Sequence, residues 1–323
     1  MKPIPFSSAE KPKLGISACL MGAQVRYNGG HKESRLCTRE LSEYFDFVPV
    51  CPEVAIGLDT PREPIRLVGD PHDPRAVGTV NPALDVTGKL AAYAERMVHE
   101  LDGICGYIFM HKSPSCGLER VKVYRDNGVP SSETGSGVYA GVFSERRPEL
   151  PLEEDGRLND AVLRENFITR VFAYHAWQQL LAKGLSRRAL TEFHSRYKYQ
   201  LMANDPAGYK ALGPLLGSMG RIDAERIAPL YFRQLMTSLR KPATRRTHTN
   251  VLQHLSGYLK QTLGTDDKQE MQHVISQYHQ GIVPLVVPLT LFKHHFRHHP
   301  DPYVAIQVYL QPHPENLSLR NAI

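Results

Sequence analysis

The 323-residue sequence has no apolar run near the roughly 18 residues that a membrane-spanning helix requires. Its first residues, Met1–Phe6, include two prolines and lack the apolar core of a signal peptide. Low-complexity tracts and internal repeats are also missing, and 41% of the residues are hydrophobic, which is typical of globular proteins. We therefore expect a soluble, cytoplasmic protein with no membrane partner and no obligate protein partner.

Cysteine is scarce, with five residues at irregular spacing. In a chain without a secretion signal, this pattern argues against a disulfide framework. No Cys-x-x-Cys pair occurs, which disfavours zinc ribbons and thioredoxin-type redox motifs. The thiols are expected to be reduced and available for metal binding or catalysis.

The first half of the chain lacks any excess of positive charge. Residues 1–150 carry 18 Lys and Arg against 19 Asp and Glu, whereas residues 151–323 carry 21 against 14. The segment 185–246 alone contains 12 basic and 4 acidic residues. This division predicts chemistry in the first half and binding of a polyanion in the second.

Short apolar runs alternate with a helical pattern in the first half. The loop at 20–30 bears glycines but no GxGxxG dinucleotide fingerprint. Such alternation predicts an α/β fold with a mostly parallel sheet, which binds ligands at the carboxyl ends of its strands. The predicted strands cover about 14–19, 47–51, 107–110 and 121–124, and the predicted helix covers 85–101.

The second half is predicted to be an all-α domain packed as a helical bundle. Its helical periodicity covers 158–182, 186–204, 220–240, 249–263, 268–280 and 286–298. The segment before it is acidic and contains prolines and a glycine. The predicted organisation is a flexible tail at 1–12, an α/β domain at 13–148, a linker at 149–160 and a helical domain at 161–323.

Three cysteines lie at the ends of predicted strands: Cys19 and Cys51 each close a strand, and Cys116 lies in the loop after one. Because parallel strands bring their carboxyl ends to one edge of a sheet, we expect the three thiols to converge. Three thiolates suit a [4Fe-4S] cluster in which one iron has no protein ligand. Zinc held by three thiolates and a water also fits, and so does burial of each cysteine as a small hydrophobic residue.

The other two cysteines are weaker candidates for ligands. Cys37 lies at a predicted helix start, where it is either a fourth ligand or a bystander. Cys105 lies before the strand at 107–110, at the end opposite the loop that carries Cys116. For Cys105 we expect burial rather than ligation.

Polar residues near the cysteines suggest acid–base chemistry. Glu53 follows Cys51 by two residues, and Ser113 precedes Cys116 by three. If the thiols converge, Glu53 can act as a general base on water, and Ser113 can relay a proton. Taken without the thiols, both residues would be interpreted as turn caps.

Residues 13 to about 145 resemble the thiouracil desulfidase family. The resemblance rests on Ser17–Gly22 with Val25–Asn28, on Val50–Val54 with Gly57–Leu58, and on Lys112–Gly117. It implies a Rossmann-like domain in which Cys19, Cys51 and Cys116 hold a [4Fe-4S] cluster, with Glu53 as the base and Ser113 as the proton relay. It also points to Arg26, Asn28 and Lys112 as substrate contacts. The implied reaction transfers sulfur to the cluster without net electron transfer, while water activated by Glu53 supplies the oxygen.

Residues from about 185 to 316 are similar to a helical domain that accompanies this family in tRNA 4-thiouridine desulfidases. The similarity rests on Pro288–Leu291, Lys293–His294, Asp301–Tyr303 and Gln307–Tyr309. Basic residues interleaved with aromatic residues suit a phosphate backbone with some stacking, although a charge run is also typical of a solvated helix face. The aromatic residues in question are Tyr197, Tyr199, Tyr209, Tyr231 and Phe232. The candidate RNA contacts are Arg187, Arg188, Arg196, Lys198, Arg245, Arg246, Lys293 and Arg297.

The run Lys293–His299 contains four histidines, paired at i, i+4 spacing. Such pairs can bind zinc, but the run has no acidic ligand, and its Lys and Arg repel a cation. We therefore interpret it as a polar helix end that contacts RNA.

The sequence predicts an iron-sulfur enzyme that hydrolytically converts 4-thiouridine in tRNA to uridine. One alternative is a desulfidase of free thiouracil or thionucleosides, with the helical half serving assembly. An alternative of another class is a non-catalytic RNA-binding or redox-sensing iron-sulfur protein.

Overall fold

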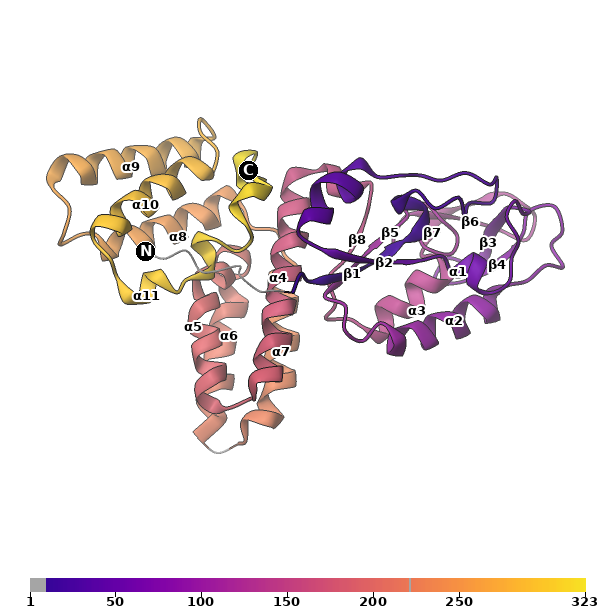
Figure 1. Cartoon of the computed structure of the whole chain (residues 1–323), viewed down its shortest axis with the longest axis horizontal. Helices are drawn as coiled ribbons and strands as arrows, with labels where there is room; N and C mark the ends of the chain where they lie inside the picture. The colour runs from indigo at the N-terminus through magenta and orange to yellow at the C-terminus, as the bar shows by residue number, and fades with distance from the viewer. Residues whose placement is uncertain (1–9, 221) are drawn as a thin grey trace. The chain divides into compact units, whose positions relative to one another are not determined.

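Figure 1 shows the computed structural model of the chain, which describes residues 10–220 and 222–323. These residues form two compact units, 10–159 and 160–323. The first unit is α/β and the second is helical, which confirms the predicted fold class. Within the described ranges, no helix is both long and apolar enough to cross a membrane.

A parallel sheet forms the centre of the first unit. Its order is β2 (Asp46–Val50), β1 (Lys13–Ser17), β5 (Gly106–Phe109) and β8 (Leu152–Glu154). Neighbouring strands all run parallel, so the carboxyl ends of β1, β2 and β5 lie at one edge. This arrangement brings the segments that follow these strands together, as predicted.

Strand β8 differs from the prediction, because it lies inside the segment 149–160 that was expected to be a linker. Its two acidic residues suggested an exposed segment, yet both are 6% exposed. Glu154 accepts hydrogen bonds from the backbone of Leu118 and Glu119, and Glu153 accepts one of 2.6 Å from Nε of Arg157. These partners offset the cost of burying the two carboxylates.

The predicted tail is only partly described. Residues 1–9 of the stretch 1–12 lie outside the described residues. Lys11 and Pro12, however, are attached to the sheet unit: Lys11 Nζ donates to the carbonyl of Ser42, and the Pro12 carbonyl accepts from the backbone N–H of Asp46.

A second, mixed sheet packs in the same unit, and only one of its strands was predicted. Its order is β4 (Asp73–Gly78), β3 (Ile65–Asp70), β6 (Val121–Tyr124) and β7 (Pro130–Gly135). The β3–β4 and β6–β7 pairs are antiparallel, and β3 runs parallel to β6. The short α1 (Pro52–Ala55), α2 (Thr87–Glu100), which matches the predicted helix, and α3 (Val138–Arg146) complete the unit.

Aromatic packing explains a glycine in the central strand. The rings of Tyr107 and Phe109 on β5 stack at 4.0 Å, and both contact Phe143 of α3. A Cβ atom at Gly15 of β1 would lie 2.3 Å from the Tyr107 ring. Only glycine therefore lets this ring pack against the neighbouring strand.

The second unit consists of helices, as predicted; six of them match the predicted helices apart from their ends, and two further helices were not predicted. In chain order they are α4 (Ala161–Lys183), α5 (Arg187–Asn204), α6 (Pro206–Gly217), α7 (Ala224–Leu239), α8 (Arg245–Tyr258), α9 (Thr265–Gln280), α10 (Val286–His298) and α11 (Pro302–Ala305). Capping residues determine several starts. Asp160 accepts from the backbone of Val162 and Leu163 at α4, and Ser186 accepts from that of Ala189 at α5.

Helix α6 was not predicted, because the glycines and prolines in its sequence indicate a break between helices. Pro206 lies in the first turn, where its missing N–H leaves no helical bond unmade. A Cβ atom at Gly208 would lie 2.1 Å from the Ser238 hydroxyl. Close packing on α7 therefore requires this glycine, although it weakens the helical pattern of the sequence.

Candidate active site

A cavity of about 390 Å³ lies at the carboxyl ends of β1, β2 and β5. All three predicted ligands, Cys19, Cys51 and Cys116, line it together with Glu53 and Ser113. Cys19 lies in a 3-10 turn (Ala18–Met21), because β1 ends earlier than predicted. The segments after the three strands therefore meet as the sequence suggested.

The three thiols are poorly solvated and interact with one another. Burial, together with the negative charge of a Cys51 thiolate, raises the pKa of Cys19 to about 11. Burial also raises the pKa of Cys51 and, with the negative charges of Glu53 and Cys51, that of Cys116. A bound cation would favour the thiolate forms, so this donor set suits a metal group.

Three thiols line the cavity, and thiolates are the donors that an iron-sulfur cluster uses. Within residues 10–220 and 222–323, no three His, Cys, Asp or Glu side chains converge closely enough to hold one metal ion. A cluster of several irons has no such requirement, since each thiolate binds its own iron. Three thiols around one cavity thus fit a cluster.

The remaining cysteines do not line this cavity. Cys37 is fully buried, and Cys105 is 1% exposed. Burial raises the pKa of Cys37 to about 11 and that of Cys105 to about 12. Burial of Cys105 was expected, and Cys37 has the same character.

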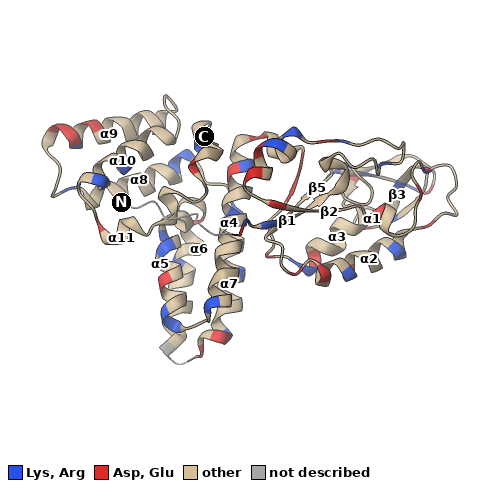
Figure 2. Ribbon diagram, in the orientation of Figure 1, with Lys and Arg blue, Asp and Glu red and all other residues tan. Residues whose placement is uncertain are grey.

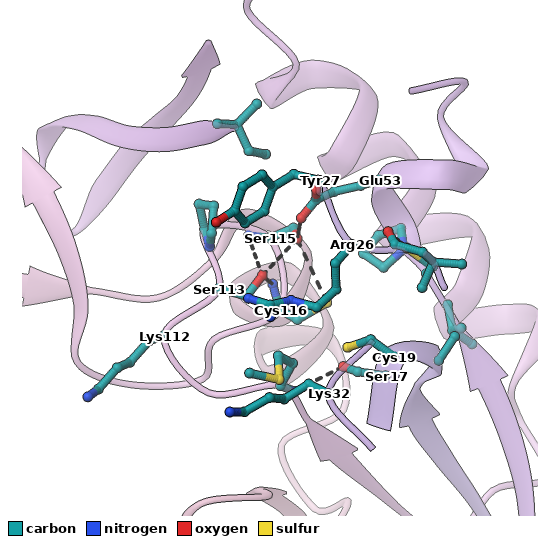
Figure 3. Close-up of a pocket in the computed structure, with 18 of the residues that line it drawn as sticks. Ser17, Cys19, Arg26, Tyr27, Lys32, Glu53, Lys112, Ser113, Ser115 and Cys116 are labelled. Atoms are coloured by element: carbon teal, nitrogen blue, oxygen red, sulfur yellow. Dashed lines mark hydrogen bonds between the residues drawn. The ribbon is translucent and has the colours of Figure 1, made fainter. Parts of the chain in front are cut away.

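Glu53 lies in α1, the short helix that begins directly after Cys51. Both oxygens of its carboxylate accept hydrogen bonds. Ser115 Oγ donates a hydrogen bond of 2.5 Å to Oε1, as Figure 3 shows. Arg62 donates to Oε2 from Nε at 2.9 Å and from Nη2 at 2.6 Å. Neither Ser115 nor Arg62 was singled out from the sequence.

Ser113 reaches the carboxylate only through Ser115. Its hydroxyl accepts from the backbone N–H groups of Ser115, at 3.3 Å, and Cys116, at 3.1 Å. The two serine hydroxyls lie 3.1 Å apart (Figure 3). Ser113 therefore caps the turn that presents Cys116, and its hydroxyl also joins a chain that ends at Glu53.

The loop that carries these serines is tightly constrained. Lys112 adopts a left-handed conformation, with φ of 56°, which is unusual for a residue other than glycine. A Cβ atom at Gly137 would lie 2.6 Å from the Ser115 carbonyl, so glycine is required where α3 approaches the loop. Strain and close contact of this kind are frequent at functional sites.

The predicted substrate contacts divide into two groups. Arg26 and Lys112 line the cavity, and the Lys112 side chain extends away from the serines in Figure 3. Asn28 does not line it, and its side chain accepts from the backbone N–H of Gly30. The prediction for Asn28 is therefore not supported by its position. Tyr27, which was not proposed, lines the cavity with its ring exposed.

His111, which lines the cavity, is paired with a carboxylate. His111 Nδ1 lies 2.7 Å from Asp155 Oδ1, and the same oxygen accepts from the His111 backbone N–H. Because an ionised carboxylate only accepts, Nδ1 is the donor in this contact. The sequence drew attention to His111 but not to Asp155, which lies in the expected linker.

The basic residues predicted to contact RNA lie on the helical unit, and Figure 2 colours the Lys and Arg residues blue. Some of these residues have partners within that unit. Arg188 pairs with Glu192, and Lys293 pairs with Glu315. Lys198 lies over the rings of Tyr199 and Tyr303, and Arg245 donates to the carbonyl of Tyr278. Side chains of Arg187, Arg246 and Arg297 are exposed, and that of Arg196 is partly exposed.

The expectation of base stacking by aromatic residues is wrong for the buried ones. Tyr197, Tyr199 and Tyr231 are 0–3% exposed and belong to the helical core. Tyr209 and Phe232 are partly buried against the same core. The helices direct these rings inward and the charges outward, because burying apolar surface stabilises the unit.

Comparisons with known proteins match one family model to part of each half of the chain. Residues 14–155 match the family model described as 2-thiouracil desulfurase. Residues 198–314 match a model described as a protein of unknown function (DUF1722).

Individual relatives cover about half of the chain. The uncharacterized protein YbgA of Escherichia coli (strain K12) is 31% identical over 159 residues, which are 49% of this chain and 94% of YbgA. The uncharacterized protein YbbK of Bacillus subtilis (strain 168) is 33% identical over 158 residues, which are 45% of this chain and 97% of YbbK. A solved structure of the [4Fe-4S]-dependent thiouracil desulfidase TudS is 29% identical and covers 46% of this chain and 94% of its own, with a TM-score of 0.35. Through residues 14–155, the chain belongs to the 2-thiouracil desulfurase family, and residues 198–314 add a DUF1722 domain.

Proposed function

We propose that this protein is a [4Fe-4S]-dependent desulfidase that converts 4-thiouridine in tRNA to uridine without net electron transfer. The observation that carries the proposal is the meeting of three thiols and a serine-linked carboxylate in one cavity, in a chain of this family. The overall reaction replaces C=S by C=O, consumes one water and releases one sulfide.

Each residue of the cavity has a role in this proposal. Cys19, Cys51 and Cys116 would hold the cluster, which would supply a thiophilic Lewis acid when bound. Glu53 accepts a proton from the attacking water. Its position supports this role, since the carboxylate lines the cavity that the thiols also line.

Ser113 and Ser115 carry protons between the cavity and Glu53. The Ser115 hydroxyl already donates to Oε1, and the Ser113 hydroxyl lies within hydrogen-bond distance of Ser115. A proton that leaves the water can therefore reach Glu53 directly or by exchange along the two hydroxyls. The relay that the sequence predicted at Ser113 is thus proposed here as a two-serine path. Arg26 and Lys112 are proposed to contact the substrate at the cavity wall.

The charge of the helical half supports tRNA as the substrate. Residues 151–323 carry 21 basic against 14 acidic side chains, and a polyanion binds such a surface through its phosphates. The proposed contacts are Arg187, Arg188, Arg196, Lys198, Arg245, Arg246, Lys293 and Arg297. Arg187, Arg246 and Arg297 are the foremost of these, because their side chains are exposed.

Free thiouracil, or a thionucleoside, is a second candidate substrate. The family description names the free base, and a cavity of about 390 Å³ is within the range that suits small ligands. In that case the helical half has a role other than substrate binding.

Purification without oxygen, followed by cluster reconstitution, allows the two substrates to be compared. Loss of thiouridine absorbance is measured with thiolated tRNA and with free 4-thiouracil. We expect turnover of the tRNA at a higher kcat/KM. Turnover of the free base alone would support the second candidate. A chain that binds iron but removes sulfur from neither substrate would contradict both and would leave a non-catalytic iron-sulfur protein.

A further inference from the structure

Arg62 is a buried arginine in the cavity wall to which the family comparison assigns no role. Its side chain is 7% exposed and lines the cavity. Both Nε and Nη2 donate to one oxygen, Oε2, of Glu53. The guanidinium therefore holds that oxygen from two directions.

The same guanidinium connects three segments of the wall. Nη2 also donates to the carbonyl of Val25 at 2.9 Å, and Nη1 donates to the carbonyl of Asp59 and to Thr60 Oγ1, each at 3.2 Å. The Arg62 backbone N–H donates to the carbonyl of Tyr27 at 2.7 Å. The loop with Arg26 and Tyr27, the segment before Arg62 and the carboxylate of Glu53 are thus joined by one side chain.

The two oxygens of Glu53 have different surroundings as a result. Oε2 accepts two hydrogen bonds from Arg62, whereas Oε1 accepts one from Ser115, which precedes Cys116 in the chain. A carboxylate held by one partner only can rotate and exchange its oxygens. Held on both sides, it keeps one oxygen toward the serines.

A buried ion pair alone is weak evidence of stabilisation, because desolvation offsets much of the attraction. A fold that needed only stability here would be served by apolar side chains. The five side-chain donations from a planar, permanently charged group instead restrict position and direction.

We propose that Arg62 is the positioning residue for the base: it holds Glu53 Oε2 and the Val25–Tyr27 loop, so that Oε1 faces Ser115 and the cavity. The proposal rests on the proposed function of Glu53 as the base. Arg62 acts through Glu53 and does not itself contact the reacting atoms.

A mutant cycle on the reconstituted enzyme tests this coupling. The variants are Arg62→Met, Arg62→Lys, Glu53→Gln and the double variant Arg62→Met with Glu53→Gln. We expect Arg62→Met to lower kcat per bound iron at least about 10-fold, since a small misplacement of a reacting group has effects of this size. Iron content should be unchanged, and Arg62→Lys should recover part of kcat. In the Glu53→Gln background, Arg62→Met should lower kcat no further.

Hydrogen–deuterium exchange of the cluster-free chain gives a readout independent of activity. Arg62→Met should speed exchange in peptides covering 25–30 and 56–62, and leave α2 unchanged. Arg75→Met is the matched control, because Arg75 is half exposed and pairs with Asp85 and Asp126 at the surface. If Arg62→Met does not fold, Arg62→Lys and Arg62→Gln are measured in both experiments.

Each result decides between the alternatives. Unchanged kcat per iron in Arg62→Met, or a further loss in the Glu53→Gln background, would overturn the positioning role. A loss of iron and activity in proportion would show a purely structural role. If the wild-type chain removes no sulfur, the proposed function fails, and the exchange experiment decides alone whether Arg62 holds the two segments.

Discussion

Ser115 Oγ donates to Glu53 Oε1 at 2.5 Å, although 62 positions separate the two residues in the chain. Ser115 is fully buried and follows β5, whereas Glu53 lies in α1 after β2. The contact exists because both strands end at the same edge of the sheet. It links the carboxylate to the loop that presents Cys116.

Replacement of Ser115 tests this link. Ser115→Ala removes the donor to Oε1 while the backbone of the loop keeps its cap at Ser113. We expect kcat to fall about 100-fold, as for loss of a proton-transfer group, with iron content unchanged. Steady-state rates per bound iron and iron analysis check this result.

Ser113→Ala should behave differently. Its hydroxyl accepts two backbone N–H groups, so its loss disturbs the turn before Cys116 and should lower both iron content and activity. Ser144→Ala is the control, since that hydroxyl donates to the Gly141 carbonyl in α3 and does not line the cavity. Equal effects of Ser113→Ala and Ser115→Ala on iron would argue against the division of roles.

Cysteine variants test the proposed cluster ligands. Cys116→Ala should lose the cluster, measured as iron per chain and as visible absorbance after anaerobic reconstitution. Cys105→Ala should keep it, because Cys105 is buried away from the cavity. Iron retained at wild-type levels in Cys116→Ala would contradict the ligand assignment.

The basic helical surface predicts a difference in salt dependence between substrates. With thiolated tRNA, log(kcat/KM) should fall steeply with log[salt], whereas free 4-thiouracil should react nearly independently of salt. Arg246→Glu should flatten the slope for tRNA by about one unit or more and leave the free base unaffected. Lys89→Glu on the exposed face of α2 is the control with the same charge change. Equal salt slopes for both substrates would contradict phosphate contacts.

A buried ion pair predicts how the helical unit responds to substitution. The Glu165 carboxylate accepts a 3.0 Å hydrogen bond from Nε of Arg320, which also donates to the Tyr309 carbonyl. Arg320→Met would remove the permanently charged partner of this buried carboxylate, which would keep the Thr169 hydroxyl at 3.3 Å and His313 Nε2 at 3.7 Å, and should lower the free energy of unfolding by about 3–5 kcal/mol. Urea unfolding followed by Trp177 fluorescence measures this, because Trp177 is the single tryptophan and is buried in α4. A double variant, Glu165→Leu with Arg320→Met, should be less destabilised than Arg320→Met alone.

Buried histidines predict that the helical unit loses stability in mild acid. Burial and the nearby Arg320 charge lower the pKa of His248 from 6.5 to about 3, and burial lowers that of His194 to about 4. The unfolded chain therefore binds protons that the folded unit excludes, so stability is complete above about pH 6.5 and declines as the pH falls toward the folded values. For His248 the free energy of unfolding should drop by about 2 kcal/mol between pH 7.5 and 5.

The control for this pH effect is His248→Gln, which can retain a hydrogen bond to the Tyr309 hydroxyl without titrating. The variant should show a smaller decrease in stability between the two pH values. A decrease equal to that of the wild type would exclude His248 as a source of the effect.

Many strands and helices could be predicted from the local sequence pattern. Apolar runs predicted β1, β2, β5 and β6, and periodicity predicted most helices of the second unit, because these signals reflect which face each element buries. In the elements that were not predicted, tertiary contacts stabilise a strand or helix that the local sequence pattern disfavours. Glu153 and Glu154 look exposed but are paired inside β8, and Gly208 looks like a helix break but is required by the packing of α6 on α7.

The sequence by itself determined which residue types are available: three thiols at the ends of three predicted strands, and a glutamate and a serine within three residues of two of them. These assignments depend on chain proximity, which the sequence displays directly. Only the tertiary structure decided which partners Glu53 has, because Arg62 and Ser115 approach it from separate loops. It also separated Cys37, Cys105 and Asn28 from the cavity and buried Tyr197, Tyr199 and Tyr231. The physical reason is that burial and hydrogen bonding depend on how distant segments meet.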